Sequence, residues 1–278
     1  MKLIYFKADI GNFGDDLNDW LWEKIFGDFK NYPDVDFVGI GSILDERLDN
    51  DRKKLIFGSG VRSFLYQVSD PSKYDIRFVR GPVSAKVLDE KFITDSAYAL
   101  KLIDDSKDHQ KKYDVSFIPY YRHYHFLNKK MISSIAGVNI INPLLPVEEV
   151  IKEVKASRKI IAAAMHGAIL ADIYRIPWRR CRIGRHGFEN YLTSELKWED
   201  WSKSLDIDDL KTLDIDVSLH NHPKIINTLK SIYIARAIKK AKNDYTLSDD
   251  EIFWKRINEL KVEIEKLKNE SLFTPSEI

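Results

Sequence analysis

Short apolar runs alternate with amphipathic segments through the first hundred residues. Runs rich in β-branched and aromatic residues, bounded by turn residues, are typical of buried strands. They predict strands over residues 2–8, 36–41, 53–60 and 75–80. Three helices are expected between and after them: one with Asp15 and Asp16 in its first turn that ends near Phe26, one that opens at Gly81-Pro82, and one that begins near Asp95. Strands that alternate with helices imply a mostly parallel sheet.

The alternation restarts after a polar, charged run over residues 104–112, which we interpret as a linker. The second part of the chain predicts strands over 114–120 and 138–141, a helix after His125 and a helix over 147–157. A chain of 278 residues is long for a single core, so its length favours two domains. The predicted fold is α/β, with two tandem α/β domains, residues 1–105 and 112–222, that face a cleft, and a C-terminal helical segment, residues 223–278.

The C-terminal segment predicts two helices. The first, over 223–242, is basic, and we favour a solvated face over contact with anionic lipid, which stays the alternative. The second starts at a predicted capping box, Ser248 to Glu251. Its apolar positions follow four- and three-residue steps: Phe253, Ile257, Leu260, Ile264 and Leu267. About two heptads are too few for an isolated coiled coil, so docking on its own domain is favoured, with a homodimer contact as the alternative.

Composition narrows the class of protein. The formal net charge of +1 gives no global electrostatic case for nucleic-acid binding. Cys181 is the only cysteine, which excludes an intrachain disulfide and a thiolate metal cage. The first nine residues are too charged for a signal peptide, and no apolar run approaches membrane-spanning length. We therefore expect a cytoplasmic protein, with contact at the inner face of the membrane as the alternative.

Residues 158–177 form the most informative segment. Ile160 and Ile161 predict a buried strand, Gly167 is expected to turn the backbone sharply, and residues 168–174 predict an amphipathic helix that stops before Pro177. His166 would then lie where the carboxyl end of a strand meets the start of a helix. Ligands bind in this crevice of open α/β sheets, and helix-start N–H groups favour anions. A titratable imidazole there points to chemistry on an anionic substrate.

Seven segments, in order along the chain, together resemble the polysaccharide pyruvyl transferase family, specifically the branch that adds ketal pyruvate to exopolysaccharide sugars. They are residues 12–18 (NFGDDLN), 57–60 (FGSG), 80–84 (RGPVS), 94–96 (TDS), 117–122 (FIPYYR), 164–172 (AMHGAILAD) and 197–201 (KWEDW). Two places depart from the family pattern. Ala163 and Ala164 stand where an acidic or hydroxyl residue often precedes Met-His-Gly, and Tyr120 stands where Ile-Pro is often followed by histidine.

The resemblance implies an enzyme that transfers pyruvyl from phosphoenolpyruvate to a sugar of a polysaccharide or its precursor, forming a cyclic ketal and releasing phosphate. It also implies a fold similar to two-domain glycosyltransferases of the B type, which have two Rossmann-like domains. Phosphoenolpyruvate would be a co-substrate, with no further cofactor. The acceptor would be a glycan, lipid-linked or nucleotide-linked, and no nucleic acid is expected as a partner.

This chemistry needs cations for the donor's phosphate and carboxylate, a general acid for C3 of the enol, and a base for the sugar hydroxyl. His166 is the candidate acid or phosphate ligand, and Asp15 is the candidate base. The residues expected to bind substrate are Asn12, Asp16, Ser59, Gly60, Arg80, Arg122, His123, Met165, Gly167 and Arg185. For Arg80 an ordinary ion pair is an equal alternative. For His123 and His125 a loop surface is favoured, and no metal site is expected because no matching ligand pattern accompanies them.

The arginines between residues 175 and 185 allow two interpretations. They could line the rim of the cleft as an anion funnel, or pair with acidic surface residues. Trp198 and Trp201 are expected to be packing residues, and Asp172 is expected to stabilise structure. Two alternative functions stay open: a nucleotide-sugar-dependent glycosyltransferase, and a catalytically silent glycan-binding relative.

Overall fold

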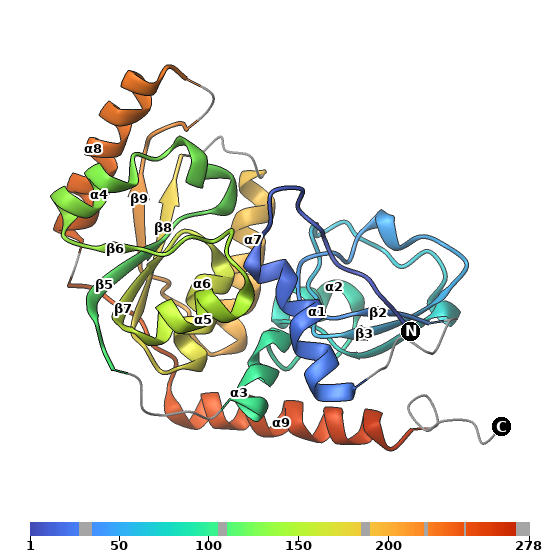
Figure 1. Ribbon diagram of the computed structural model, residues 1–278. Helices are drawn as coiled ribbons and strands as arrows, with labels where there is room; N and C mark the ends of the chain where they lie inside the picture. Colours follow the sequence, from blue (N-terminus) through green and yellow to red (C-terminus); the bar gives the residue numbers. More distant parts are fainter. Residues whose placement is uncertain (28–34, 105–109, 185–189, 220–221, 242, 271–278) are drawn as a thin grey trace.

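The structure, a computed structural model, describes residues 1–27, 35–104, 110–184, 190–219, 222–241 and 243–270 (Figure 1). It is a mixed α/β fold with two parallel sheets. The first sheet has the strand order β1-β2-β3-β4 and contains β1 (Lys2–Leu3), β2 (Val35–Val38), β3 (Lys53–Phe57) and β4 (Tyr74–Phe78). The second has the order β6-β5-β7-β8-β9 and contains β5 (Tyr113–Ile118), β6 (Asn139–Ile140), β7 (Ser157–Ala162), β8 (Trp178–Ile183) and β9 (Thr212–Ile215). The prediction of an α/β chain with parallel strands is confirmed.

Helices connect and cover these strands. The α-helices are α1 (Phe13–Phe26), α2 (Pro82–Leu88), α3 (Leu100–Ile103), α4 (Lys129–Ala136), α5 (Val147–Lys155), α6 (Met165–Ile173), α7 (Tyr191–Ser204), α8 (Lys224–Lys240) and α9 (Asp250–Lys268). Short 3-10 helices add η2 (Glu46–Leu48), η3 (Pro71–Lys73), η4 (Ser96–Ala99) and η5 (Tyr121–Phe126). The predicted starts of α1 and α2 are confirmed, with Asp15 and Asp16 in the first turn of α1 and Pro82 at the first position of α2.

Most strands are shorter than the hydrophobic pattern predicted. The strand predicted over 2–8 keeps only Lys2 and Leu3 in the sheet, and β3 ends at Phe57 instead of residue 60. After β3, Gly58 has a φ of 88°, a backbone conformation that glycine adopts without strain. Beyond β1, the apolar side chains of Ile4, Tyr5 and Phe6 are half-buried in a loop and have the hydropathy of strand residues, whereas beyond β3 the chain continues as a buried turn over residues 58–60.

The segment around His166 differs from prediction in two ways. Helix α6 begins at Met165, so Gly167 lies inside the helix and does not turn the chain. A Cβ on Gly167 would lie 3.0 Å from Cδ1 of Ile118, so the glycine allows α6 to pack closely on β5. The helix is also not amphipathic: eight of its nine residues are buried, because it is enclosed by α1, α5, η4 and the second sheet.

The second sheet has its switch point between β5 and β7. The chain passes from β5 to its neighbour β6 on one side and then crosses to β7 on the other side. Loops that leave the carboxyl ends of two such strands diverge, and the crevice between them is where open α/β sheets bind ligands. The loops after β5 and β7 therefore mark this edge as the place for a site.

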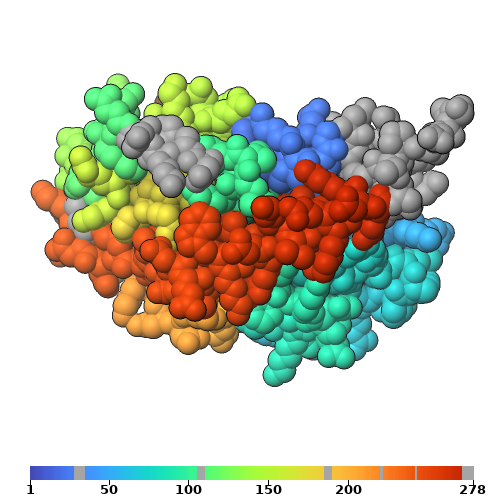
Figure 2. All heavy atoms as spheres, turned by 90° about the horizontal axis from the view of Figure 1, so that it is seen from below, coloured from blue at the N-terminus to red at the C-terminus, as the bar shows by residue number. Residues whose placement is uncertain are grey.

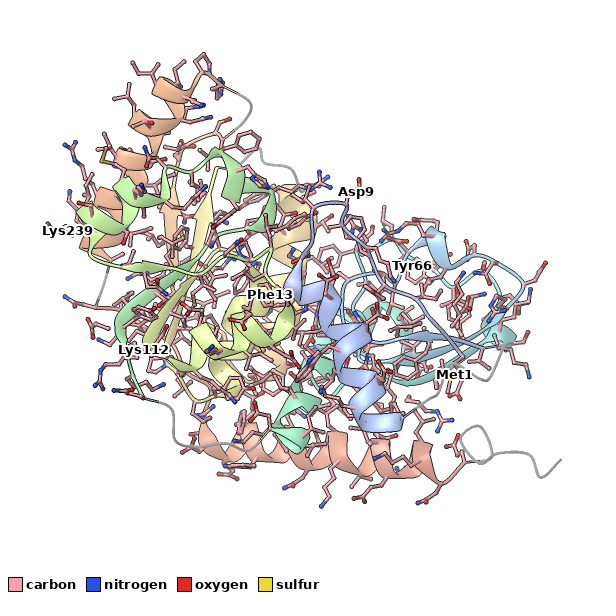
Figure 3. The ribbon with its side chains drawn as sticks, viewed as in Figure 1. Met1, Asp9, Phe13, Tyr66, Lys112 and Lys239 are labelled. Carbon is pink, nitrogen blue, oxygen red and sulfur yellow. The ribbon has the colours of Figure 1, made fainter. Side chains whose placement is uncertain are left out.

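The two halves of the molecule share a hydrophobic core. One buried cluster joins residues of α1, such as Phe13 and Leu17, to Val150 of α5, Leu170 of α6 and Leu260 of α9. Figure 3 labels Phe13 where α1 begins, at the junction of the halves. Helix α7, from the second half of the chain, also packs against α2 of the first. A second cluster lies under α4 and α8 and includes Cys181, whose pKa burial raises to about 12.

Helix α9 docks on its own chain, as predicted. Figure 2 shows it running across both halves of the molecule, and it contacts η4 and α3. Its five apolar side chains are at most 4% exposed, so this face is not available to a second copy. The predicted capping box is wrong by one residue: Asp249, not Ser248, caps the helix, because the Ser248 hydroxyl donates to buried Asp172. None of the helices that the structure describes is long and apolar enough to span a membrane.

Candidate active site

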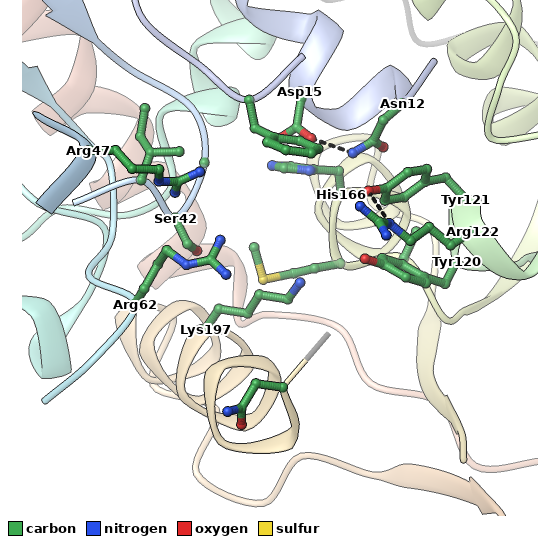
Figure 4. Close-up of a pocket in the computed structure, with 16 residues that line it drawn as sticks. Asn12, Asp15, Ser42, Arg47, Arg62, Tyr120, Tyr121, Arg122, His166 and Lys197 are labelled. Atoms are coloured by element: carbon green, nitrogen blue, oxygen red, sulfur yellow. Dashed lines mark hydrogen bonds between the residues drawn. The ribbon is translucent and has the colours of Figure 1, made fainter. Parts of the chain in front are cut away.

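A cavity of about 250 Å³ lies between the two sheets. We call it the inter-sheet cavity (Figure 4). The first half of the chain contributes Phe6, Asn12, Asp15, Gly41, Ser42, Ile43, Arg47 and Arg62. The second half contributes Tyr120, Tyr121, Arg122, Ala164, Met165, His166, Asn190 and Lys197. Tyr120 to Arg122 follow β5 and Ala164 to His166 follow β7, so the cavity occupies the switch point of the second sheet.

His166 lies in the first turn of α6 and faces this cavity. Its Nε2 is buried and has no hydrogen-bond partner. The other ring nitrogen lies against α1, where a Cβ on Gly14 would be only 2.2 Å from Nδ1. Burial, followed by the charges of Lys197 and Arg80, lowers the pKa of His166 to about 3. The imidazole is therefore neutral at pH 7.

The start of α1 brings Asn12 and Asp15 to the same cavity. The Asn12 side-chain amide donates to the Asp15 carboxylate, which fixes both groups beside His166 (Figure 4). Asp16 does not line the cavity. Its Oδ2 accepts from the Asn12 backbone N–H at 3.2 Å, and burial raises its pKa. Asp15 is thus placed to contact a ligand, whereas Asp16 holds the first turn of the helix.

Four cations surround the cavity. Arg47 and Arg62 approach from the first half and share one carboxylate, Asp45, with Arg47 Nη2 at 2.6 Å and Arg62 Nε at 3.5 Å. Arg122 approaches from the opposite side, and its Nε donates to the Tyr121 hydroxyl at 2.8 Å. Lys197 extends from α7 (Figure 4). Since Asp45 can offset only one charge of its pair, the lining is positive overall and suits an anion.

Sequence analysis identifies only part of this set. Arg122 is among the predicted residues, and Lys197 lies in a motif whose lysine had no assigned role. Arg47 and Arg62 carry no sequence signal, because they lie beyond β2 and β3, where loop packing alone decides their direction.

The structure does not bring Arg80, Ser59 or Gly60 into the cavity. Arg80 is fully buried in an ion pair, with Nε 3.1 Å from Asp200, so its predicted alternative as an ordinary ion pair is the one observed. Its Nη1 donates to the Ser42 hydroxyl at 2.6 Å. The Ser59 hydroxyl donates to the carbonyl of Gly41 at 3.0 Å. All three therefore lie behind the lining and support the loop that carries Ser42.

The remaining predicted residues have different positions. Met165 lines the cavity, but Gly167 does not. His123 is 6% exposed, with its ring centroid 5.4 Å from that of Tyr120, so the favoured loop-surface placement is wrong for this residue. It packs behind Tyr120 because η5 turns it inward. Arg185 lies outside the described residues.

The other arginines of the 175–185 cluster form ion pairs. Arg175 pairs with Asp250, Arg179 with Asp244, Arg180 with Glu195, and Arg182 with Asp214 and Glu195. The interpretation as surface pairs is confirmed for these four, and they form no anion funnel.

Trp198 and Trp201 are buried against Trp178, and Asp172 accepts from Tyr98, Trp178 and Ser248, as their predicted structural roles require. Within the described ranges, no group of three or more His, Cys, Asp or Glu residues could hold a metal ion.

The fold and the cavity define an α/β protein with a positively charged site at the carboxyl ends of parallel strands. The model of the polysaccharide pyruvyl transferase family matches residues 5–182. The succinoglycan biosynthesis protein ExoV of Rhizobium meliloti (strain 1021) is 36% identical over 213 residues, which are 74% of this chain and 66% of ExoV. The chain therefore belongs to the polysaccharide pyruvyl transferase family, and it spans just under two thirds of the length of this relative.

A solved structure of an uncharacterised protein from Klebsiella pneumoniae subsp. pneumoniae NTUH-K2044 is also similar. The match covers 76% of this chain and 92% of that chain, with 16% sequence identity and a TM-score of 0.45.

Proposed function

We propose that this protein transfers a pyruvyl group from phosphoenolpyruvate to a sugar of a polysaccharide or its precursor, forming a cyclic ketal. The observation that carries the proposal is the inter-sheet cavity, where four cations, one imidazole and one carboxylate meet. Family membership and the name of the succinoglycan relative support the same class of reaction. We further propose that the sheets belong to two Rossmann-like domains of the glycosyltransferase-B type, residues 1–105 and 112–222, with residues 223–278 as a helical segment.

The donor carries a phosphate and a carboxylate, and the cavity offers cations from two sides. Arg47 and Arg62 on one wall and Arg122 on the other can each bind an oxyanion in a fork, while Lys197 acts as a point charge. The amides at the start of α6 add a further anion-binding element. A small dianion or trianion would offset the excess positive charge of the lining.

His166 acts as the general acid for C3 of the donor. In the free protein the imidazole is neutral, because burial and nearby positive charge lower its pKa to about 3. A bound donor places negative charge beside Lys197, which removes part of that repulsion and raises the pKa of the imidazole. His166 can therefore carry the proton for C3 only when the donor is bound.

The bonds change in four steps. The proton of His166 adds to C3, and the electron pair of the C2–C3 double bond forms the new C–H bond. A sugar hydroxyl then attacks C2 and loses its proton to Asp15. The C2–O bond to phosphate breaks, and phosphate leaves with that electron pair. A second hydroxyl of the acceptor attacks C2, closes the ring and loses its proton to the released phosphate or to water.

The test is a panel of glycans, including oligosaccharides prepared from succinoglycan, incubated with phosphoenolpyruvate. We expect phosphate release with a matching mass gain of pyruvate on one glycan. His166→Ala should reduce this turnover at least about a hundredfold, as loss of a general acid does, without a change in circular dichroism. His222→Ala is the matched control, because His222 precedes α8 and does not line the cavity. Near-normal phosphate release by His166→Ala contradicts the assignment of the acid.

Heat stabilisation separates the proposal from the two alternatives. Phosphoenolpyruvate should raise the melting temperature, since it binds only the folded chain. A nucleotide-sugar glycosyltransferase would instead be stabilised by a nucleoside diphosphate. A catalytically silent relative would bind glycan and release no phosphate.

A further inference from the structure

A second cavity, of about 530 Å³, opens beside the first. We call it the side cavity. Its lining is Phe6, Lys7, Ala8, Asp9, Ile10, Tyr121, Arg122, His125 and Phe126. Phe6, Tyr121 and Arg122 line both cavities, so the two share a wall. A ligand bound at this shared wall therefore contacts residues of both cavities.

The side cavity has different chemistry from its neighbour. Its walls carry three aromatic rings, from Phe6, Tyr121 and Phe126, together with the His125 imidazole. Its charged groups are of mixed sign: Lys7 forms an ion pair with Asp19 at 3.3 Å, and the hydrogen bond to Tyr121, together with the charge of Asp9, raises the pKa of Arg122. A lining of rings with few uncompensated charges suits a neutral ring with polar edges, because aromatic faces pack on its C–H groups while charged tips bond its hydroxyls.

The chain segment that forms one wall also leads to the catalytic groups. Residues 6–10 line the side cavity, and Asn12 and Asp15 line the inter-sheet cavity a few residues later. Figure 3 labels Asp9 in this loop and Phe13 just after it, where α1 begins. A ligand along this segment would therefore present its end to Asp15 and His166.

We infer that the side cavity binds the sugar unit of the glycan acceptor next to the unit that reacts. The inference rests on the proposed function for its ligand class. The inter-sheet cavity would hold the anionic donor and the two reacting hydroxyls, and the side cavity would hold the neighbouring ring. The side cavity, at about 530 Å³, has room for a whole monosaccharide.

The experiment measures the KM for the donor and the KM for the acceptor separately, in two variants and one control. His125→Ala and Ile10→Asp change side chains that line only the side cavity, and both residues are exposed, so the fold should tolerate the changes. The glycan is the succinoglycan oligosaccharide or the panel member that releases phosphate. Each variant should raise the acceptor KM about five- to tenfold, the loss of one side-chain packing contact with the sugar, and leave the KM for phosphoenolpyruvate within about twofold.

The control is Lys130→Ala, at an exposed position of α4 outside both cavities. It should change neither KM. An unchanged acceptor KM in His125→Ala and Ile10→Asp overturns the inference, and so does an equal rise in both KM values.

Saturation-transfer NMR of the same oligosaccharides, without donor, separates this inference from the proposed function. Binding that is lost in His125→Ala, in a protein that releases no phosphate, supports the sugar site and contradicts pyruvyl transfer. Phosphate release by the wild-type protein, together with glycan binding that is unchanged in the variants, supports pyruvyl transfer and contradicts the sugar site. Failure of the wild-type protein to bind any glycan of the panel overturns the sugar site.

Discussion

The contact between Gly14 and His166 sets the position of the imidazole. A methyl group at residue 14 would overlap Nδ1 at 2.2 Å, so Gly14→Ala must push the ring or α1 aside. We expect turnover to fall about tenfold to a hundredfold, as small displacements of a catalytic group do. Steady-state kinetics would measure the fall, and the melting temperature should fall as well, because a methyl group forced into this buried contact overpacks it.

Gly27→Ala is the matched control for that variant. Gly27 ends the same helix with a φ of 67° and has open space around it. Alanine there should cost about 1 kcal/mol of stability through backbone strain and leave turnover unchanged. If Gly14→Ala keeps full activity, the ring does not depend on this contact.

Acid should destabilise the protein through His166. In the unfolded chain the imidazole binds a proton below pH 6.5, whereas in the folded chain burial holds its pKa at about 3. The unfolded state therefore gains protons as the pH falls from 6.5 towards 3, and stability falls over that window, by about 2 kcal/mol at pH 5. Asp95 acts in the opposite direction, because burial raises its pKa from 3.8 to about 6 and the folded state binds that proton first.

Urea unfolding of His166→Gln would measure how much the His166 imidazole contributes to this loss of stability in acid. Relative to the wild type, the variant should gain up to about 2 kcal/mol when the pH is lowered from 7.5 to 5, since it has no proton to exclude. A stability difference that is the same at both pH values would show that His166 is not held neutral by the fold.

At the residue scale, the sequence predicted several of the cavity-lining residues that lie within a motif. It missed those that lie outside the motifs and reach the cavity only in the folded chain. His166, Asn12, Asp15 and Arg122 were predicted because a strand end or a helix start fixes their direction. Arg80 was misplaced because a strand-end arginine looks the same whether it meets a ligand or a buried carboxylate such as Asp200. Arg47 and Arg62 reach the cavity from loops whose course the local pattern does not encode.

At the scale of elements, α8 has an unusual exposed face. Ile225, Leu229 and Tyr233 follow four-residue steps and are 72%, 63% and 55% exposed, and Arg236 and Lys240 continue the face as a basic end. The helix follows β9, so its first turns lie at the same end of the second sheet as the inter-sheet cavity. We propose that this face contacts an anionic membrane surface, from which a lipid-linked acceptor would reach the site.

Leu229→Asp should weaken binding to vesicles that contain anionic lipid about five- to tenfold in a sedimentation assay, because it places a carboxylate where an apolar side chain would be buried. Val262→Asp, at a 47% exposed position of α9, is the control and should bind like the wild type. Equal binding by Leu229→Asp, or binding to neutral vesicles alone, would contradict membrane contact by this face.

The existence of the elements was predictable, but several of their ends were not. Hydrophobic periodicity predicted strands as far as β7 and the helices α1, α8 and α9, but it predicted no element between residues 178 and 222, where β8, α7 and β9 lie. Strand β1 ends earlier than predicted because the half-buried loop after it continues its hydropathy, and β3 ends earlier because the turn over residues 58–60 leaves the sheet. Helix α6 was taken for amphipathic because a helix enclosed on all sides has no polar face to reveal its orientation.

At the scale of the whole molecule, the core shared by the two halves predicts a single unfolding transition. Leu260 of α9 is fully buried in that core, and Leu260→Ala should cost about 2–5 kcal/mol. Hydrogen exchange would then show β3 in the first sheet and β7 in the second losing protection at the same urea concentration. Separate transitions for the two sheets would contradict one cooperative unit.

A shared core of this kind was not predictable from the sequence. The linker and the restart of the strand pattern pointed to two units, and the boundaries 1–105, 112–222 and 223–278 stay a prediction. That α1 packs on α5, and that α9 crosses to η4, depends on contacts between distant parts of the chain, which hydropathy patterns do not record.

Alkylation of Cys181, the single cysteine, can measure how often the second sheet opens in the native protein. Cys181 lies in β8 of the second sheet and is 2% exposed, and its thiol is far less acidic than a free one. Alkylating reagents attack the thiolate, so the native chain should resist them almost completely. Labelling therefore requires an opening of the second sheet that exposes Cys181. The labelling rate measures how often such openings occur in the absence of denaturant.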